Sequence, residues 1–390
     1  MIDTHPHVVN FKVCPDKVVE VVSGVPSVEG ILRSKPVKFI IDVFVKVKNK
    51  VFKVFFCLSK NPYPEFAKLD EMLLIFKKLL YKVGDVELNK EMKDAGIELS
   101  TPLMIDFEYA TIEKAKPELA YGMQIEIMKR IAKNNYGRIM PFIGFDPRRE
   151  DAVNFVKWCL FEKGFLGVKM YPKLGFHPSH RTLYNSLKTN NTLYDFYDMC
   201  QEHQIPITVH CSSGGVFSET LVGKCEERDT LVHPTAFEEV FEIFPDIYLN
   251  FAHSGGDSKW ISYIVKYMQG YPNIFSDVAY NDKAHSSGFI NYFVKLNQLL
   301  CSAVGDRIMF GSDWPMIRHT WTIKEFMSPF LKYVDEDNKD RFFYQNAIRF
   351  LFPNFEIPRR IRKILGFGIK DTPEWLASKF EEVKNLRKEE

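Results

Sequence analysis

Short apolar segments of strand length alternate with amphipathic segments of helix length through most of this 390-residue chain, and this alternation leaves few folds open. Strands are expected at 102–107, 138–145, 167–171, 205–209, 247–252, 273–278 and 307–310. Helices are expected between them, at 117–134, 149–163, 193–203, 234–244, 258–268 and 288–301. This rhythm is typical of β–α units that build a parallel sheet.

One more short strand is expected at the N-terminus, where Ile2 precedes Asp3-Thr4-His5-Pro6-His7 and two valines follow. Eight parallel units can close into a (β/α)₈ TIM barrel, in which active sites lie at the carboxyl ends of the strands. An open doubly wound sheet is the rival fold. It is disfavoured because no Gly-x-Gly-x-x-Gly motif follows an early strand and no P-loop is present. The sequence therefore predicts an α/β protein with a (β/α)₈ barrel.

The domain organisation follows from where the rhythm starts and stops. We expect one barrel domain over residues 1–390, with a long insertion at about 14–99 after the first strand and a helical tail at about 320–390. Helical spacing of apolar residues at 36–58 and 69–83 favours a helical insertion, although Asn49-Lys50 is also compatible with a hairpin turn. We expect the insertion to cover the barrel mouth or to form a subunit contact, which would make the protein a homodimer.

Charge and cysteine content exclude some classes of function. Lys and Arg number 52 against 50 Asp and Glu, so the net charge of +2 provides no field that favours nucleic acid or an anionic membrane. The seven cysteines show no paired spacing, and neither a signal peptide nor an apolar run of about 18 residues is present. We therefore expect a cytoplasmic protein with reduced thiols and a small-molecule substrate.

Residues with metal-binding or proton-transferring side chains stand where the expected strands end. One follows the fourth strand, one the fifth, one the sixth and one the eighth, and two belong to the first: Lys169, His210, His253, Asp313, His5 and His7. A single histidine after a buried strand is usually a satisfied core residue. Four histidines and an aspartate around one barrel mouth are harder to explain in that way. Nitrogen and carboxylate donors without thiolate suit Zn²⁺, or Mn²⁺, Fe²⁺ or Ni²⁺.

The chain resembles the amidohydrolase superfamily, in particular its compact branch of metal-dependent hydrolases and decarboxylases. The resemblance spans residues 3 to about 350. Its matching segments are Asp3-Thr4-His5-Pro6-His7, Pro141-Phe142-Ile143-Gly144-Phe145-Asp146-Pro147-Arg148, Gly167-Val168-Lys169-Met170-Tyr171-Pro172, Val209-His210, Ala252-His253-Ser254-Gly255-Gly256, Phe310-Gly311-Ser312-Asp313-Trp314-Pro315 and Asn346-Ala347. Each segment is weak alone, whereas the histidines and the aspartate in this order are specific.

The resemblance implies a metal ion held by His5 and His7, with Asp313 close to the ion and to its water. His210 would be a further ligand. His253 would be a ligand to a second metal or a donor that stabilises developing oxyanion charge. Asp313, His253 and His210 are therefore the expected catalytic residues, and one or two divalent ions, Zn²⁺ first among them, are the expected cofactor.

Lys169 has two alternative roles in this site. In many relatives of the superfamily a lysine at the end of the fourth strand is carboxylated and bridges two metal ions, which adds Lys169 to the expected metal ligands. An unmodified lysine would instead anchor a substrate carboxylate. A lysine whose stem simply packs against the barrel wall is the structural alternative.

Several other residues flank the expected ligands. Tyr171, Trp314 and Arg318 are expected to contact the substrate for this reason. Asp277, which ends the seventh strand, is expected either to orient a ligand or bind substrate, or to serve as a helix cap or turn residue.

The expected activity is hydrolysis of a C–N or C–O bond at a carbonyl group, by water that the metal ion and Asp313 activate. The alternative on the same fold is non-oxidative decarboxylation of an aromatic or unsaturated carboxylic acid. A catalytically inactive binding barrel is a third hypothesis, which the complete set of ligands disfavours. One fold hosts many reactions, so the resemblance does not decide between them.

Overall fold

The computed structural model describes residues 1–8, 14–15, 17–18, 85–117, 119–256, 260–319, 321–366 and 372–389. The helices expected at 36–58 and 69–83 lie outside these residues. From residue 85 onward, the described segments alternate between strands and helices as the sequence predicts.

The strands are all parallel to their neighbours. β1 (Ile2–Asp3) pairs with β2 (Leu99–Ser100), and the other six form one sheet in chain order: β3 (Phe142–Phe145), β4 (Gly167–Met170), β5 (Ile207–Val209), β6 (Leu249–Phe251), β7 (Ile274–Asp277) and β8 (Ile308–Met309). Every residue of these strands is buried, as expected where helices cover a parallel sheet and side chains fill a barrel.

Backbone contacts join the pair and the sheet into one ring. At one seam, Ser100 of β2 forms a parallel bridge with Ile139, just before β3. At the other seam, the Thr4 N–H after β1 donates to the Phe310 carbonyl after β8, with 3.4 Å between nitrogen and oxygen. The fold is therefore the (β/α)₈ barrel that the sequence predicts.

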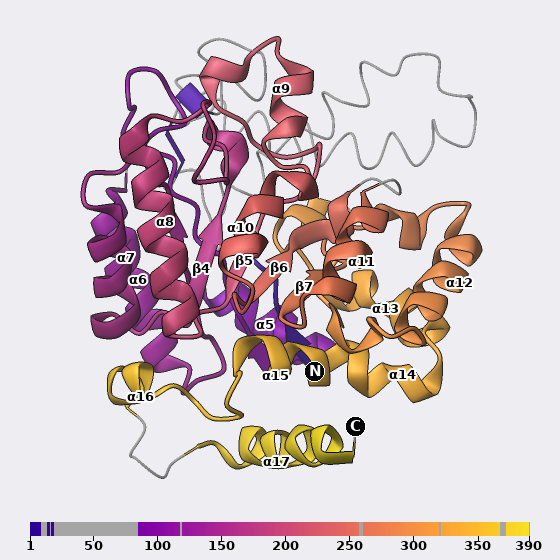
Figure 1. Ribbon diagram of the computed structural model, residues 1–390. Helices are drawn as coiled ribbons and strands as arrows, with labels where there is room; N and C mark the ends of the chain where they lie inside the picture. The colour runs from indigo at the N-terminus through magenta and orange to yellow at the C-terminus, as the bar shows by residue number, and fades with distance from the viewer. Residues whose placement is uncertain are drawn as a thin grey trace, which may run out of the picture.

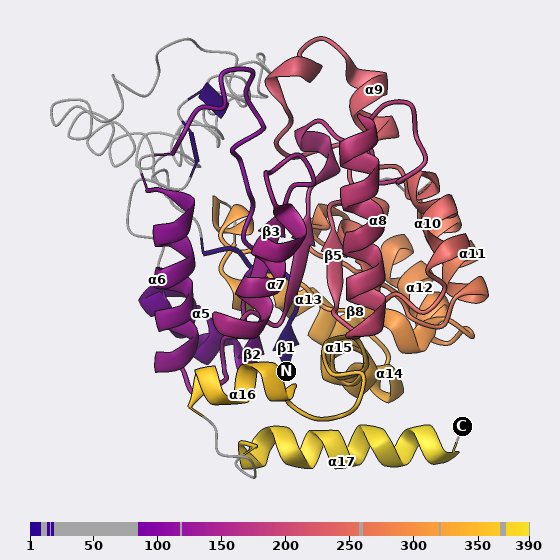
Figure 2. The same ribbon diagram turned by 60° about the vertical axis from the view of Figure 1, so that its left-hand side comes forward.

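Each strand is followed by a helix on the outside of the ring (Figures 1 and 2). In chain order these helices are α5 (Asp85–Ala95), α6 (Tyr121–Asn134), α7 (Ala152–Glu162), α8 (Leu187–Glu202), α9 (Cys225–Thr230) with α10 (Glu238–Ile243), α11 (Ile261–Gly270), α12 (Phe289–Leu300) and α13 (Ile323–Tyr333). Among the described residues, no helix is both long enough and apolar enough to cross a membrane.

Two of these helices lie in segments that the sequence assigned to the insertion and the tail. α5 falls within 14–99 and α13 lies beyond residue 320, yet both occupy ordinary positions in the barrel. Met92 of α5 and Phe330 of α13 are buried in the same core cluster as the other barrel helices. The Ile323 N–H at the start of α13 donates to the Glu91 carboxylate of α5 at 3.0 Å. The insertion therefore ends before α5.

The second strand differs from the expected 102–107. β2 covers Leu99–Ser100, and beyond it only an isolated bridge forms, between Leu103 and Phe142. Pro102 lies between the two and has no N–H to donate to a ladder, which explains why the strand is interrupted there.

Helices from the tail cover the N-terminal ends of the strands. They are α14 (Glu336–Asp340), α15 (Asn346–Leu351), α16 (Arg359–Leu365) and α17 (Glu374–Glu389). α17 lies below α15, at the end of the barrel where the N-terminus also lies (Figures 1 and 2). Its Leu376, Phe380 and Val383 side chains are buried in a second core cluster with residues of β1, β2 and β8. This end is therefore closed by apolar packing.

Short helical turns occur in the connections at the opposite, carboxyl ends of the strands. Three of them are η2 (Pro172–Leu174) after β4, η5 (Ala252–Gly255) after β6 and η8 (Met316–His319) after β8. The polar residues that the sequence predicts as a site lie at this end.

Candidate metal centre

His5 and His7 lie just beyond β1, and each is held through its Nδ1 atom. His5 Nδ1 lies 3.0 Å from Asp277 Oδ2, and His7 Nδ1 lies 2.7 Å from the Leu103 carbonyl oxygen. Both partners are acceptors, so we assign the ring proton of each histidine to Nδ1. Each Nε2 then carries a lone pair, and a neutral histidine binds a metal ion through such an atom.

Asp313, which follows β8, completes a buried group with these two histidines. Its Oδ1 lies 3.2 Å from His7 Nε2 and 3.8 Å from His5 Nε2. His5 Nε2 has no hydrogen-bond partner among the described residues. The lone pairs of His5 Nε2 and His7 Nε2 therefore face Asp313 Oδ1, and no ring proton is assigned between these atoms. Ligand atoms at about 2.1 Å from a tetrahedral zinc ion are about 3.4 Å apart, so the group fits a divalent cation.

Asp277, at the end of β7, orients this group. Its Oδ2 accepts hydrogen bonds from His5 and from Asn250 Nδ2, the latter at 2.7 Å. Its Oδ1 accepts from the backbone N–H groups of His253 and Ala279, each at 3.0 Å. Burial raises the pKa of the Asp277 carboxyl, but His5 and these hydrogen bonds outweigh burial and hold that pKa below its ordinary value. Of the roles expected for Asp277, the structure therefore shows that of orienting a histidine.

His253 and His210 form a second pair beside the first. His253 Nε2 lies 3.2 Å from His210 Nδ1. Their other ring nitrogens lie against carbonyl oxygens, at 3.0 Å from Ala279 for His253 and at 3.1 Å from Gly214 for His210. These carbonyls assign the ring protons to His253 Nδ1 and His210 Nε2, so two lone pairs face each other. Burial lowers the pKa of both histidines, which disfavours an extra proton between them.

The two pairs meet at His253, whose ring centroid lies 4.7 Å from that of His5. His210 lies outside the group formed by His5, His7 and Asp313. Its Nδ1 faces His253 instead. The ligand roles that the resemblance implies for His210 and His253 stay predictions.

Lys169 of β4 is buried at the same end of the barrel, with 1% of its surface exposed. Its Nζ has no hydrogen-bond partner among the described residues and lies 5.9 Å from the centre of the Tyr171 ring. Burial lowers the pKa of the ammonium to about 8, against the attraction of Asp277 and Asp313. A buried lysine without a partner is consistent with a role in the site.

The three residues expected to contact substrate lie in different surroundings. The Tyr171 ring stacks on His210 at 4.1 Å between centroids, with 9° between the ring planes. Trp314 is fully buried in the main core cluster. Arg318 lies in η8, and its side chain is outside what the structure describes. Substrate contact by these residues stays a prediction.

Backbone conformation also marks this end of the barrel. His253 and Asp313 have φ angles of 64° and 60°, in the left-handed region that non-glycine residues rarely adopt. Such conformations cost free energy and cluster at functional sites. Gly311 approaches closely as well, because a Cβ added there would lie 2.8 Å from His5 Cβ.

Three polar residues that support the site were not identified from the sequence. The Asp3 carboxylate accepts from the Ser312 N–H at 2.9 Å and from the Ser312 hydroxyl at 2.6 Å, which ties the end of β1 to the segment after β8. Asn250 donates to Asp277 from inside β6. For Asn250, the available signal was a polar residue within a strand otherwise made of buried apolar residues.

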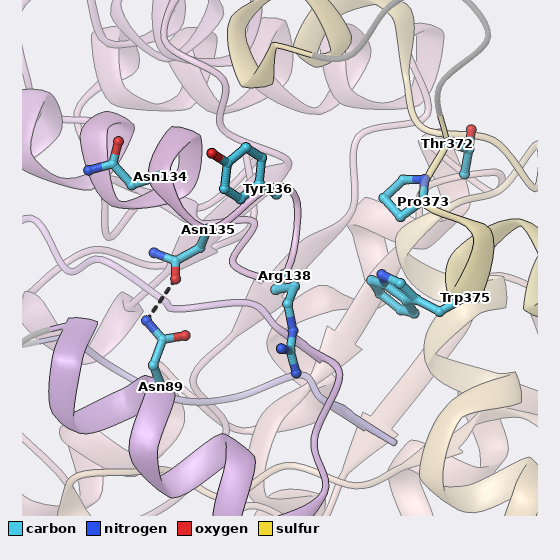
Figure 3. A pocket seen from close by; sticks show the side chains of 8 residues that line it. All are labelled: Asn89, Asn134, Asn135, Tyr136, Arg138, Thr372, Pro373 and Trp375. Atoms are coloured by element: carbon cyan, nitrogen blue, oxygen red, sulfur yellow. Dashed lines mark hydrogen bonds between the residues drawn. The ribbon is translucent and has the colours of Figure 1, made fainter.

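A hollow of about 470 Å³ lies at the opposite end of the barrel (Figure 3). Its lining includes Tyr136, Arg138 and Trp375, and an amide hydrogen bond of 2.7 Å joins Asn89 to Asn135 at its edge. The Arg138 guanidinium donates to backbone carbonyls of the segment before β2. None of the metal-binding groups found among the described residues lies there. The candidate site is therefore the mouth.

Solved structures with a similar fold cover most of the chain. An uncharacterised TIM-barrel protein from Bordetella bronchiseptica is 16% identical, with a TM-score of 0.55 over 94% of this chain and 99% of that one. A 2,6-dihydroxybenzoate decarboxylase is 15% identical, with a TM-score of 0.53 over 71% and 91%. A manganese-bound 5-carboxyvanillate decarboxylase from Novosphingobium aromaticivorans is 13% identical, with a TM-score of 0.51 over 90% and 96%. At these identities the likeness shows the fold alone.

Sequence comparison gives the family. No curated protein sequence matches the chain. The model of the amidohydrolase family matches residues 2–352, which include all of the barrel strands and every residue of the candidate site. The chain therefore belongs to the amidohydrolase family.

Proposed function

We propose that the protein is a metal-dependent hydrolase that cleaves a C–N or C–O bond at a carbonyl group of a small molecule. The observation that carries the proposal is the buried group in which His5 Nε2 and His7 Nε2 face Asp313 Oδ1. His5, His7 and Asp313 would hold the ion, with Zn²⁺ the first candidate for this set of nitrogen and oxygen donors.

A divalent ion held there would lower the pKa of its bound water to about 7 and would polarise a carbonyl oxygen. Asp313 accepts a proton from the attacking water and passes it to the leaving group. His253 would be a ligand to a second ion through its Nε2 lone pair, because its Nδ1 is bonded to a carbonyl. His210 Nδ1 lies 3.2 Å from His253 Nε2 and would be a further ligand.

Lys169 suggests the substrate class. A buried ammonium without a hydrogen-bond partner in the described part of the chain favours an anion beside it, so the proposed substrate carries a carboxylate that Lys169 anchors. The alternative is a carboxylated Lys169 that bridges two ions. Metal content separates the two, because an anchor leaves about one ion per chain and a bridge requires about two.

A second candidate is a metal-dependent decarboxylase, which the same lysine favours. A carboxylate anchored by Lys169 is itself the group that such an enzyme releases as carbon dioxide. His210 or Asp313 would then deliver a proton to the carbon that loses it. Two of the structures with a similar fold are decarboxylases of aromatic carboxylic acids. Carbon dioxide release from an aromatic or enoic acid supports this candidate, whereas turnover of an ester, lactone or amide without gas supports hydrolysis.

The site is tested by His7→Ala and Asp313→Asn. Both should abolish turnover, and His7→Ala should also lower the metal content of the purified protein, while circular dichroism shows a folded chain. The matched controls are His203→Ala and Asp246→Asn, which change exposed residues and should keep full turnover. Normal turnover in either site variant contradicts the proposed site. A wild-type protein that takes up no divalent metal after chelation indicates an inactive binding barrel instead.

A further inference from the structure

Two neighbouring loops meet at His210. One follows β4 and contains Lys173 in η2, and the other follows β5 and comprises residues 211–216. The Lys173 side chain is buried, and its Nζ donates to the carbonyls of Ser213 and Gly214, the latter at 2.9 Å. The Gly214 carbonyl also accepts from His210 Nε2 at 3.1 Å. One carbonyl oxygen, with its two lone pairs, therefore joins the lysine to the histidine.

The second loop lies against the edge of the His210 ring. The Tyr171 ring stacks on the imidazole, and its hydroxyl accepts from the Val216 N–H at 3.0 Å. Gly215 has a φ of 86°, and a Cβ added there would lie 2.2 Å from Tyr171 Oη and 2.9 Å from His210 Cε1. No side chain fits at this position, so the loop backbone itself lies against the edge of the ring.

Lys173 is the charged group that sets the direction of two carbonyls in this loop. Ser213, Gly214 and Gly215 are exposed and lie outside any helix or strand. Their carbonyl groups therefore have no regular backbone ladder to orient them. A buried ammonium that donates to two successive carbonyls provides that orientation, because hydrogen bonds from a charged donor are stronger than those between neutral groups.

The direction of the Gly214 carbonyl decides which His210 nitrogen carries the proton. Without a fixed acceptor at Nε2, the proton would move to Nδ1, where it can donate to His253 Nε2 at 3.2 Å. In that tautomer a hydrogen bond would join His210 Nδ1 to His253 Nε2. Neither nitrogen would then have a free lone pair.

We propose that Lys173 is a positioning residue, which holds the Gly214 carbonyl so that His210 keeps its proton on Nε2 and its Nδ1 lone pair toward His253. The inference deepens the proposed function, and only its kinetic consequence rests on that function.

The direct test is ¹⁵N NMR of histidine-labelled protein that has been freed of metal by chelation. His210 signals are assigned by their loss in His210→Gln. The wild type should carry the His210 proton on Nε2, whereas Lys173→Met should move it to Nδ1. Lys173→Arg, whose guanidinium can donate to two carbonyls, should retain the wild-type pattern. An unchanged His210 tautomer in a folded Lys173→Met protein overturns the inference. If that variant does not fold, Lys173→Gln, with one amide donor group, should show the same direction of shift, and no shift there overturns it equally.

Arg148→Met is the matched control for loosening of the first loop. Arg148 donates to the carbonyls of Leu174 and Gly175, at 2.9 and 3.2 Å, whereas its hydrogen bonds within the described part of the chain do not include Gly214. Arg148→Met should therefore leave the His210 tautomer unchanged. A shift equal to that of Lys173→Met would assign the effect to general loop disorder and overturn the inference.

Kinetics provide a second readout. Lys173→Met should lower kcat by about 10- to 100-fold, as loss of partners that orient site residues typically does, with little change in KM. Lys173→Arg should recover most of this loss. Absence of any turnover in the wild type would count against the proposed function, while the NMR result would still decide the inference.

Discussion

Asp277 uses both carboxylate oxygens to orient groups of the site. It accepts from the His5 ring, from the Asn250 side-chain amide and from the backbone N–H groups of His253 and Ala279. An aspartate in this position sets which nitrogen of His5 faces the metal group, so its effect should appear in metal binding as well as in activity.

Asp277→Asn should weaken metal binding by about 10- to 100-fold, because an amide offers one acceptor oxygen where Asp277 uses two. Either the His5 and Asn250 side chains or the His253 and Ala279 backbone N–H groups would then face an amide N–H, which cannot accept their hydrogen bonds. The measurement is competition for zinc with a chelator of known affinity. Asp306→Asn is the control, because Asp306 pairs with Arg307 and Arg349 beside the start of β8, away from the mouth. Equal metal affinity in Asp277→Asn and the wild type would contradict the assigned role.

Gly311→Ala should destabilise the protein by about 1–3 kcal/mol, because the new Cβ would lie 2.8 Å from His5 Cβ and force the histidine or the backbone to shift. Thermal denaturation of the metal-free protein measures the loss. Gly122→Ala in α6 is the control, since a Cβ there meets nothing within 4 Å and should stabilise the helix by up to about 1 kcal/mol. Equal stability of the two variants would show that the close approach at Gly311 is unimportant.

At the scale of elements, position in the barrel decides what a helix does. α5 and α13 have the same amphipathic pattern as any surface helix, so the sequence placed them in an insertion and a tail. Only the tertiary structure shows that their apolar faces complete the ring of barrel helices. The strand ends were predictable because parallel strands in consecutive β–α units all end at one mouth. The second strand was predicted at 102–107, from Pro102 onward, whereas β2 lies before that proline, at Leu99–Ser100.

Phe380→Ala in α17 should lower the free energy of unfolding by about 3–5 kcal/mol, because the side chain is 4% exposed and its ring packs edge to face on Phe352 at 5.0 Å. Chemical denaturation measures the change, and the metal affinity of the folded protein should not move, since α17 packs at the end opposite the mouth. Met123→Ala, at an exposed position in α6, should stay within about 0.5 kcal/mol of the wild type. A loss of metal affinity in Phe380→Ala would show that the two ends of the barrel are coupled.

At the scale of the whole molecule, the two ends of the barrel differ in chemistry. Apolar side chains from the tail close the N-terminal end, whereas four histidines, two aspartates and a lysine meet at the other: His5, His7, His210, His253, Asp277, Asp313 and Lys169. This division follows the general rule that barrel stability and barrel chemistry lie at opposite ends of the strands.

Replacing residues 19–84 by a flexible linker tests the expected role of the insertion. Metal uptake should be retained, because α5 and every candidate ligand lie outside the deleted segment. Substrate range or oligomeric state should change, as measured by activity over a substrate panel and by analytical ultracentrifugation. If both properties stay as in the full chain, the expectation that the segment covers the mouth or forms a subunit contact is wrong.

The sequence by itself determined the class of fold and which of the expected site residues stand at strand ends, because the periodicities of strands and helices are local properties of the chain. The tertiary structure alone decided the partners of the four histidines. Three of those partners are the backbone carbonyls of Leu103, Gly214 and Ala279. Every residue has such a carbonyl, so no residue type marks it in the sequence. Its direction, and with it the nitrogen that faces the metal group, depends on how the loops pack.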